Sequence, residues 1–203
     1  MSTLQMILFA AIGVSLVVSF VMKMKPAPRR GARKVLAAAP WLDDDSPDGS
    51  QVKITGVAKM REHGERFVSP LTDARCVVLR MRVLVRHGMN PKAKLVEDLK
   101  IKPFVVETED GKFLVDSEHV LLDIEPAKQP KNAIPGKTKY LTELGYKDAN
   151  FGQSECEETL VEVGAAITVA GKLAKEDPRR IVGSEEHPIA IKLERRGDVS
   201  HEP

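Results

Sequence analysis

Residues Leu4–Met22 form a run of nineteen residues that contains no charged side chain. A helix of about 18 or more apolar residues is long enough to cross the hydrocarbon core of a bilayer. A helix in the core of a water-soluble domain shows a polar face, and this run has almost none. Its few interruptions are Gln5, Gly13, Ser15 and Ser19. We therefore expect residues 1–25 to be a transmembrane anchor and the chain to be a single-pass membrane protein.

A basic cluster follows the apolar run, and no acidic residue comes before Asp43. The cluster consists of Lys23, Lys25, Arg29, Arg30, Arg33 and Lys34. Because Lys and Arg accumulate on the cytoplasmic side of a membrane span, the rest of the chain is expected in the cytoplasm. The same side chains could also bind anionic lipid headgroups, at about 1 kcal/mol each. Lipid binding is not needed to explain the cluster, because a membrane span with this topology already requires basic residues on its cytoplasmic side. The short, self-contained chain favours a bacterial inner membrane over an organelle membrane.

A cleaved secretory signal is the alternative to a retained anchor. A signal peptide has a basic start, a shorter apolar core and a small-residue cleavage site. Met1–Thr3 carry no Lys or Arg, and the only suitable small-residue tract, Ala37–Ala39, lies beyond the basic cluster. The sequence favours the anchor, and the cleaved form stays open.

The charge balance differs between the two ends of the chain. The whole chain has a formal charge of +2, from 31 basic and 29 acidic residues. Six of the basic residues belong to the basic cluster, so residues 35–203 carry 25 basic and 29 acidic side chains, a net charge of −4. With only 4% aromatic residues, this mildly acidic part lacks the basic surface and stacking platforms of nucleic-acid-binding proteins. We expect no nucleic acid as a partner.

The chain has two cysteines, Cys76 and Cys156. Two are too few for the usual cysteine-rich zinc site, and the cytosol would keep both reduced. Cys76 lies in an apolar run and is expected to be a small buried residue. A structural disulfide is conceivable only if the topology is reversed.

Residues 26–50 have the composition of a juxtamembrane linker. They contain the acidic run Asp43–Asp45 and four prolines, Pro26, Pro28, Pro40 and Pro47. Such a stretch does not bury enough apolar area to fold alone, so we expect it to provide reach. Residues 51–193 are expected to form one β domain, and residues 194–203 a disordered tail.

Short alternating runs predict the strands of this domain. Val52–Val57 is typical of a first short strand, and Cys76–Arg86 predicts a long strand with one buried face. Asp110-Gly111 stands between the runs Phe104–Thr108 and Phe113–Asp116, which is a strong hairpin signature and favours a type I′ turn.

The remaining segments complete the prediction of a mainly β fold. Gly88–Lys100 is polar and predicts a loop or a ragged hairpin, and Thr138–Leu144 has helical spacing with Gly145 as its stop. Glu158–Leu173 predicts a strand pair with a turn at Gly164, and Pro188–Leu193 closes the domain. We expect a small sandwich or a partly open barrel with one short helix, preceded by the N-terminal transmembrane helix.

No catalytic, cofactor-binding or metal-ligating residue is predicted. The five histidines and two cysteines show neither His-x-x-x-His nor Cys-x-x-Cys spacing. His63 between Glu62 and Glu65 is more typical of a solvated loop than of a metal site. A dyad of Cys76 with a histidine could form only through the fold. The acidic cluster is expected to be a solvated edge, and it comprises Glu155, Glu157 and Glu158.

Several sequence segments, in their order and spacing, resemble the GIDE domain, also called the "beside a membrane" domain. They are Ser69–Thr72, Pro103–Val106, Asp110–Asp116, Tyr140–Gly145 and Glu158–Leu173. The resemblance covers about residues 51–193. That family includes mitochondrial-anchored RING-type E3 ubiquitin ligases and bacterial relatives, and its eukaryotic members have two transmembrane helices and a C-terminal RING finger.

This chain departs from that pattern at both features. It has one long apolar run, and its two cysteines are too few for the zinc sites of a RING finger. The resemblance therefore implies a membrane-adjacent β domain that binds a ligand or a protein partner without catalysis. A component of ubiquitin or ubiquitin-like transfer, with the catalytic part on another subunit, is the alternative that the family name implies. A third possibility is an assembly factor that oligomerises on the membrane.

Overall fold

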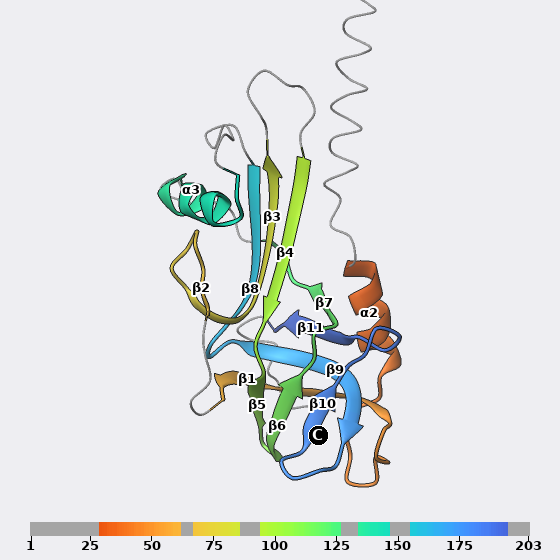
Figure 1. Cartoon of the computed structure of the whole chain (residues 1–203). Coiled ribbons are helices and arrows are strands. Elements are labelled where there is room, and N and C mark those ends of the chain that lie inside the picture. The colour runs from red at the N-terminus through yellow and green to blue at the C-terminus, as the bar shows by residue number, and fades with distance from the viewer. Residues whose placement is uncertain (1–28, 62–66, 86–93, 127–133, 147–154, 195–203) are drawn as a thin grey trace, which may run out of the picture.

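The computed structural model describes residues 29–61, 67–85, 94–126, 134–146 and 155–194. In chain order its elements are α2 (Arg29–Ala38), β1 (Gln51–Met60), β2 (Phe67–Val68), β3 (Arg75–Val85), β4 (Lys94–Ile101), β5 (Phe104–Thr108), β6 (Gly111–Asp116), β7 (Val120–Asp123), α3 (Ile134–Glu143), β8 (Glu155–Glu162), β9 (Ala166–Ala174), β10 (Arg180–Val182) and β11 (Ile189–Leu193). Figure 1 shows a barrel with α2 beside it and an elongated sheet above, with α3 at the side of that sheet. The expectation of a mainly β fold is confirmed.

The barrel contains five strands in the order β1-β5-β6-β10-β9, and it closes because β1 also pairs with β9. The pairing of β10 with β6 is parallel, and the other four pairings around the barrel are antiparallel. Alternate residues point inward, so Ile54, Val169 and Ile181 meet Phe104 and Phe113 in an apolar core. Of the two predicted architectures, the barrel is the one that forms. The prediction that it is partly open is wrong, because the pairing of β1 with β9 closes it.

Helix α2 packs against the outside of the barrel sheet, where β11 and β7 continue it beyond β9. Ala32, Leu36 and Ala39 form a small apolar cluster with Ala170 of β9 and Ala190 of β11. These small side chains let the helix approach the strands closely. The helix lies within the stretch that we expected to be a linker, so the prediction of a loose tether is wrong for these residues.

The upper sheet is built around β3, which pairs with β2, β4 and β8. Helix α3 covers one face of it, where Tyr140 and Leu141 pack with Leu79, Met81 and Leu160. The predicted short helix is therefore confirmed, although it begins at Ile134. The other face of β3 was expected to be exposed, but Arg82 and Leu84 on that face are only 6% and 7% exposed.

The strand pairing decides two predictions of strand connection. The polar stretch that ends at Lys100 contains β4, which pairs with β3, so the hairpin interpretation holds and the loop interpretation does not. The strands on either side of Gly164 do not form a pair, because β8 pairs with β3 while β9 pairs with β1, β10 and β11. Gly164 therefore marks the passage of the chain from the upper sheet to the barrel.

The hairpin predicted at Asp110-Gly111 joins β5 to β6. Only Gly111 has a positive φ, of 124°, in this turn. A type I′ turn needs positive φ at both central residues, so this hairpin uses a different turn.

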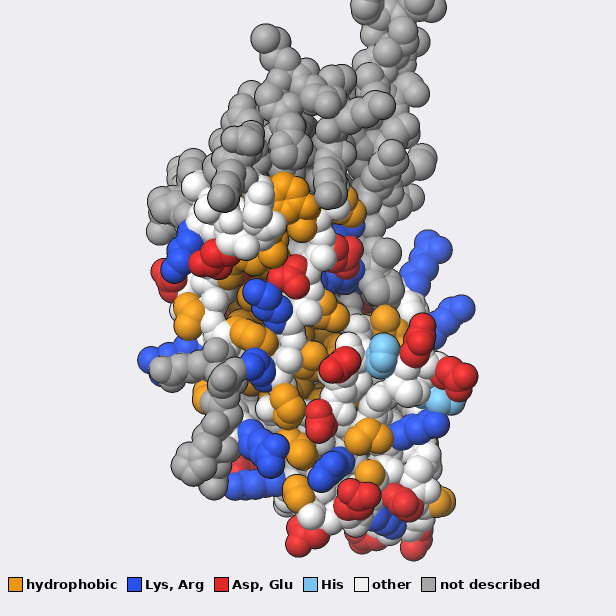
Figure 2. Space-filling model, in the orientation of Figure 1, with side chains coloured by type: hydrophobic (Ala, Val, Ile, Leu, Met, Phe, Trp, Pro, Cys, Tyr) orange, Lys and Arg blue, Asp and Glu red, His pale blue; other side chains and the backbone are white. Residues whose placement is uncertain are grey.

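Within the described residues, no helix has the length and hydropathy needed to cross a membrane. The predicted span Leu4–Met22 and the first two residues of the basic cluster lie outside the described residues. Figure 2 shows hydrophobic side chains between charged ones over the upper sheet, and Asp and Glu side chains gathered at the lower end of the barrel.

Candidate ligand-binding groove

A groove of about 1220 Å³ lies on the outer surface of the barrel beside α2. Its lining comes from α2, from Trp41, from residues of β1, β9 and β11, and from the β5–β6 turn. We name it the Trp41 groove and define it by Trp41, Lys53, Thr55, Glu107, Asp110 and Thr168. It is larger than the clefts of about 300–1,000 Å³ that hold most small ligands, so a small ligand would fill only part of it.

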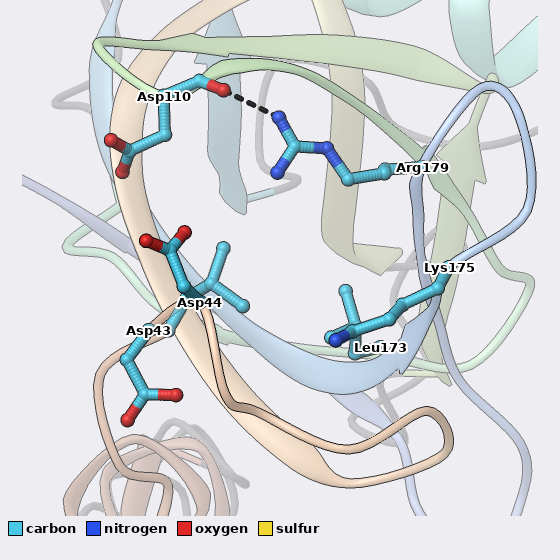
Figure 3. A pocket seen from close by; sticks show the side chains of 7 residues that line it. Asp43, Asp44, Asp110, Leu173, Lys175 and Arg179 are labelled. Atoms are coloured by element: carbon cyan, nitrogen blue, oxygen red, sulfur yellow. Dashed lines mark hydrogen bonds between the residues drawn. The ribbon is translucent and has the colours of Figure 1, made fainter.

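A smaller hollow of about 450 Å³ adjoins the Trp41 groove, since Asp110 lines both. Asp43, Asp44, Lys175 and Arg179 also line this Asp110 hollow. Figure 3 shows the Arg179 guanidinium directed at Asp110, whose main-chain carbonyl accepts its hydrogen bond. The same guanidinium lies 4.5 Å from the centroid of the Phe113 ring, so Arg179 is held in place by the barrel.

The floor of the Trp41 groove is a chain of hydrogen bonds across neighbouring strands. Thr168 of β9 pairs in register with Thr55 of β1 on one side and with Lys192 of β11 on the other. The two threonine hydroxyls lie 2.6 Å apart, and Thr168 also donates to Glu194. Lys192 Nζ lies 3.1 Å from the same carboxylate. The floor is therefore polar and fixed before any ligand arrives.

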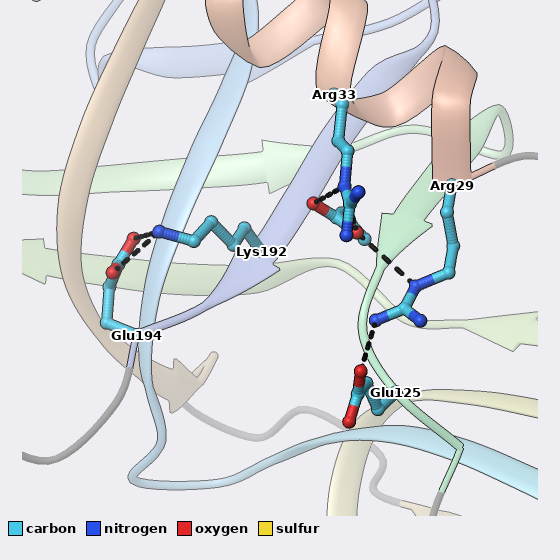
Figure 4. A network of polar contacts seen from close by, with 6 residues as sticks. Arg29, Arg33, Glu125, Lys192 and Glu194 are labelled. Carbon is cyan, nitrogen blue, oxygen red and sulfur yellow. Dashed lines mark hydrogen bonds and ion pairs between the residues drawn. The ribbon is translucent and has the colours of Figure 1, made fainter.

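One wall of the groove is fixed by ion pairs between α2 and the end of β7 (Figure 4). Arg33 Nε lies 2.9 Å from Asp123 Oδ2, and Arg29 Nε lies 3.4 Å from Asp123 Oδ1. A further contact of 3.3 Å joins Arg29 to Glu125. The hydrogen bond to Asp123 raises the pKa of Arg33, so the guanidinium stays charged. Part of the predicted basic cluster thus anchors the helix to the barrel, whereas Arg30 and Lys34 are exposed.

Trp41 is the only tryptophan of the chain, and 58% of it is exposed. The backbone holds it, because Lys53 N donates to Pro40 O at 2.8 Å and Leu42 N donates to Lys53 O at 3.0 Å. The Lys53 ammonium lies 4.5 Å from the centroid of the indole ring. Tryptophan is enriched among the residues that contribute most to binding at interfaces, and these two hydrogen bonds fix where Trp41 is presented.

The edge of β1 is open to the groove for a short distance. Lys53 pairs with Trp41, and Val57 pairs with Glu107 of β5. Thr55 lies between them, and the ladders of the described residues give it a partner only on the β9 side. Its backbone is therefore available at the groove.

A separate polar cluster is buried in the upper sheet, and it corrects the prediction of a solvated acidic edge for Glu158. Glu158 is only 1% exposed, and Ser69 and Thr72 donate hydrogen bonds to its carboxylate. Burial raises the pKa of Glu158, and these two hydrogen bonds oppose that shift. Gly136 of α3 lies so close to the carbonyl of Pro70 that a Cβ would come within 1.8 Å of its oxygen. The cluster therefore fixes the turn on which α3 packs, and substrates cannot reach it.

The other residues considered in the sequence do not form a reactive site among the described residues. Cys76 and Cys156 are free and buried, and burial raises the pKa of each thiol to about 11. His119 and His187 are exposed, and the other three histidines lie outside the described ranges. No group of three or more His, Cys, Asp or Glu side chains in the described part is placed to hold a metal ion.

Trp41 was not predicted as a site residue. The sequence did contain a hint that Trp41 is a binding residue, because the only tryptophan of the chain stands next to Pro40 and close to the acidic run Asp43–Asp45. Comparison of the chain with protein-family models, curated proteins and solved structures gave no match. The resemblance to the GIDE domain therefore stays a prediction from the sequence segments between residues 69 and 173.

Proposed function

We propose that the protein is a membrane-anchored binding module whose Trp41 groove holds a ligand or a segment of a partner protein at the cytoplasmic face of the membrane. The observation that carries the proposal is the exposure of Trp41, 58%, at the margin of a groove with a polar, prearranged floor. Binding sites combine such apolar surface with a few fixed polar groups that orient the occupant. The proposal is for binding alone and assigns no catalytic role to the residues of the groove.

The anchor in this proposal rests on the apolar run Leu4–Met22 and on the basic cluster after it. Helix α2 begins at Arg29, shortly after that run, and packs directly on the barrel. A short connection of this kind would hold the groove close to the lipid surface.

The binding part is tested with two substitutions on α2. Ala37 and Ala38 are both exposed, but only Ala37 lines the groove. We expect Ala37→Trp to fill the groove and to abolish retention of the bound partner or ligand, while Ala38→Trp retains it. The readout is quantitative mass spectrometry of what remains bound to the detergent-extracted full chain. Equal retention by the two variants, or equal loss, contradicts a binding role of the groove.

The anchor part is tested by fractionation of the native host. We expect the full-length chain in the membrane fraction after a high-salt wash, and a C-terminal tag resistant to protease added outside intact cells. Recovery of a chain shortened at its amino end and free in the periplasm contradicts the anchor.

A further inference from the structure

We infer that the exposed face of α2 docks on anionic lipid headgroups, an inference that rests on the membrane anchor proposed above and is independent of what the groove binds. The face consists of Arg30, Lys34 and Ala38, and we name it the α2 crest. These residues follow one another at intervals of four, so they lie on one side of the helix, and all three are exposed. The opposite side of α2 packs on the barrel through Ala32 and Leu36.

The structure divides the basic residues of α2 into paired and unpaired cations. Arg29 and Arg33 pair with Asp123, at 3.4 Å and 2.9 Å. The side chains of Arg30 and Lys34, in contrast, have no hydrogen bond or ion pair with the part of the chain that the structure describes. No acidic side chain stands in the first turn of α2, so the positive end of the helix dipole adds to the field of Arg30. The α2 crest therefore presents positive charge outward.

The length of chain before α2 limits how far the crest can lie from the bilayer. Residues 23–28 separate Met22, the end of the apolar run, from Arg29 at the start of the helix. Even a fully extended connection of this length covers no more than about 25 Å. The headgroup layer takes up about 5–8 Å of that distance, and Lys34 lies only about 6 Å further along the helix than Arg30. If the apolar run is the anchor, both cations are therefore held within reach of the headgroups.

The distribution of acidic side chains favours the same orientation of the domain. Figure 1 shows that α2 begins on the side of the barrel nearer the upper sheet. Asp and Glu side chains gather at the other, lower end of the barrel (Figure 2). A negatively charged membrane surface attracts the start of α2 and repels that lower end.

Anionic lipid is the partner that this position of the crest favours. Cations close to a membrane span attract anionic headgroups, by about fivefold for each Lys or Arg. The anchor brings the lipid to the crest, whereas an acidic protein would have to be recruited from solution. Because α2 also forms one wall of the Trp41 groove, docking of the crest would fix how the groove is turned relative to the bilayer.

The test measures energy transfer from Trp41, the only tryptophan, to a dansyl-labelled lipid in nanodiscs that hold the full chain. Trp41 reports the position of the crest, because α2 packs on the barrel and backbone hydrogen bonds hold the residues on either side of Trp41 to β1. We expect more transfer in nanodiscs of mixed phosphatidylglycerol and phosphatidylcholine than in phosphatidylcholine alone. Added salt should reduce this difference, because it screens the exposed charges.

A matched pair of double variants checks where the charge acts. We expect Arg30→Gln with Lys34→Gln to weaken the docked state about 30-fold, at about fivefold for each cation. The control, Lys112→Gln with Lys175→Gln, removes the same charge from two exposed residues at the start of β6 and just after β9. The control should respond to phosphatidylglycerol as the wild type does. Equal responses of the two double variants overturn the inference.

The remaining outcomes separate this inference from the proposed function. If the chain enters both kinds of nanodisc and the transfer is the same in both, docking of the crest is wrong while the anchor stands. If the chain is recovered free of lipid from both, the anchor and the inference are wrong together. An acidic protein that co-purifies with wild type but not with the Arg30→Gln, Lys34→Gln variant, without any response to phosphatidylglycerol, overturns the inference in favour of a protein partner. The Ala37→Trp comparison decides the role of the groove by itself.

Discussion

Glu158 is the buried carboxylate whose removal should be felt most in the upper sheet. It is 1% exposed, and Ser69, which donates to it, is 0% exposed. Glu158→Ala leaves the Ser69 hydroxyl without its acceptor, which costs about 1–3 kcal/mol for a buried polar group. The void left by the side chain adds about 1 kcal/mol, and the loss of a desolvated charge offsets part of the sum. We expect a net decrease of about 2 kcal/mol in the free energy of unfolding.

The glutamine variant separates the hydrogen bonds from the charge. In Glu158→Gln the amide oxygen can still accept from Ser69, so we expect a change below about 1 kcal/mol at neutral pH. Because burial raises the pKa of Glu158 in the folded protein, the folded state holds this proton more tightly than the unfolded state. The stability contributed by Glu158 is therefore complete below its ordinary value of 4.5 and decreases as the pH rises through the raised pKa. Wild type should gain stability relative to Glu158→Gln as the pH falls.

The assay is urea unfolding of the full chain in non-ionic detergent, followed by far-ultraviolet circular dichroism between pH 4 and pH 8. Glu118→Gln is the control, because Glu118 is exposed and does not act on the pKa of Glu158, and such changes stay within about 0.5 kcal/mol. The reasoning is refuted if Glu158→Ala is as stable as Glu118→Gln. It is also refuted if wild type gains stability relative to Glu158→Gln as the pH rises.

Three further predictions concern the barrel, α2 and the thiols. Gly56→Ala should lower the melting temperature, at a cost of about 1–3 kcal/mol, because a Cβ there would come within 2.4 Å of the Glu107 carbonyl oxygen; an unchanged melting temperature contradicts this. Asp123→Asn should speed hydrogen exchange of the α2 amides about fivefold at low salt by removing the negative charge that pairs with Arg29 and Arg33, whereas Asp116→Asn on an exposed position should not. With pKa values of about 11, Cys76 and Cys156 should resist a thiol reagent at pH 8 in the folded chain, and both should react in urea; rapid labelling without urea would show that they are accessible.

The strands were predictable from sequence because alternation and turn residues act locally. Val52 and Ile54 gave the first strand, and Asp110-Gly111 gave the hairpin between β5 and β6. The partners of β8 and β9 were not predictable, because the pairing of β8 with β3 joins residues about 80 positions apart. Strands β8 and β9 are consecutive in the chain but belong to different sheets, because each pairs with strands that are distant in sequence. Such long-range pairing is not visible in a single sequence.

Two corrected predictions had local signals that composition concealed. The prolines and acids of residues 26–50 indicated a tether, yet Ala32, Leu36 and Ala39 recur at the spacing of one helix face, and that face is buried. Glu158 was grouped with its charged neighbours, yet on a strand it shares a face with Cys156 and Leu160, and both are buried. In each case the periodicity of the element was a better guide than the polarity of the stretch.

The Trp41 groove itself could not be predicted, because it is assembled from parts that meet only in the folded chain. Trp41 and the α2 wall come from the segment before β1, whereas Thr168 and Glu194 come from the last part of the domain. An occupant that contacts the α2 wall would stabilise the docked helix, because a ligand that binds one state better shifts the equilibrium toward that state. If the apolar run is the membrane anchor, α2 connects that anchor to the groove. The ion pairs of Arg29 and Arg33 with Asp123 hold this helix, and with it one wall of the groove, on the barrel.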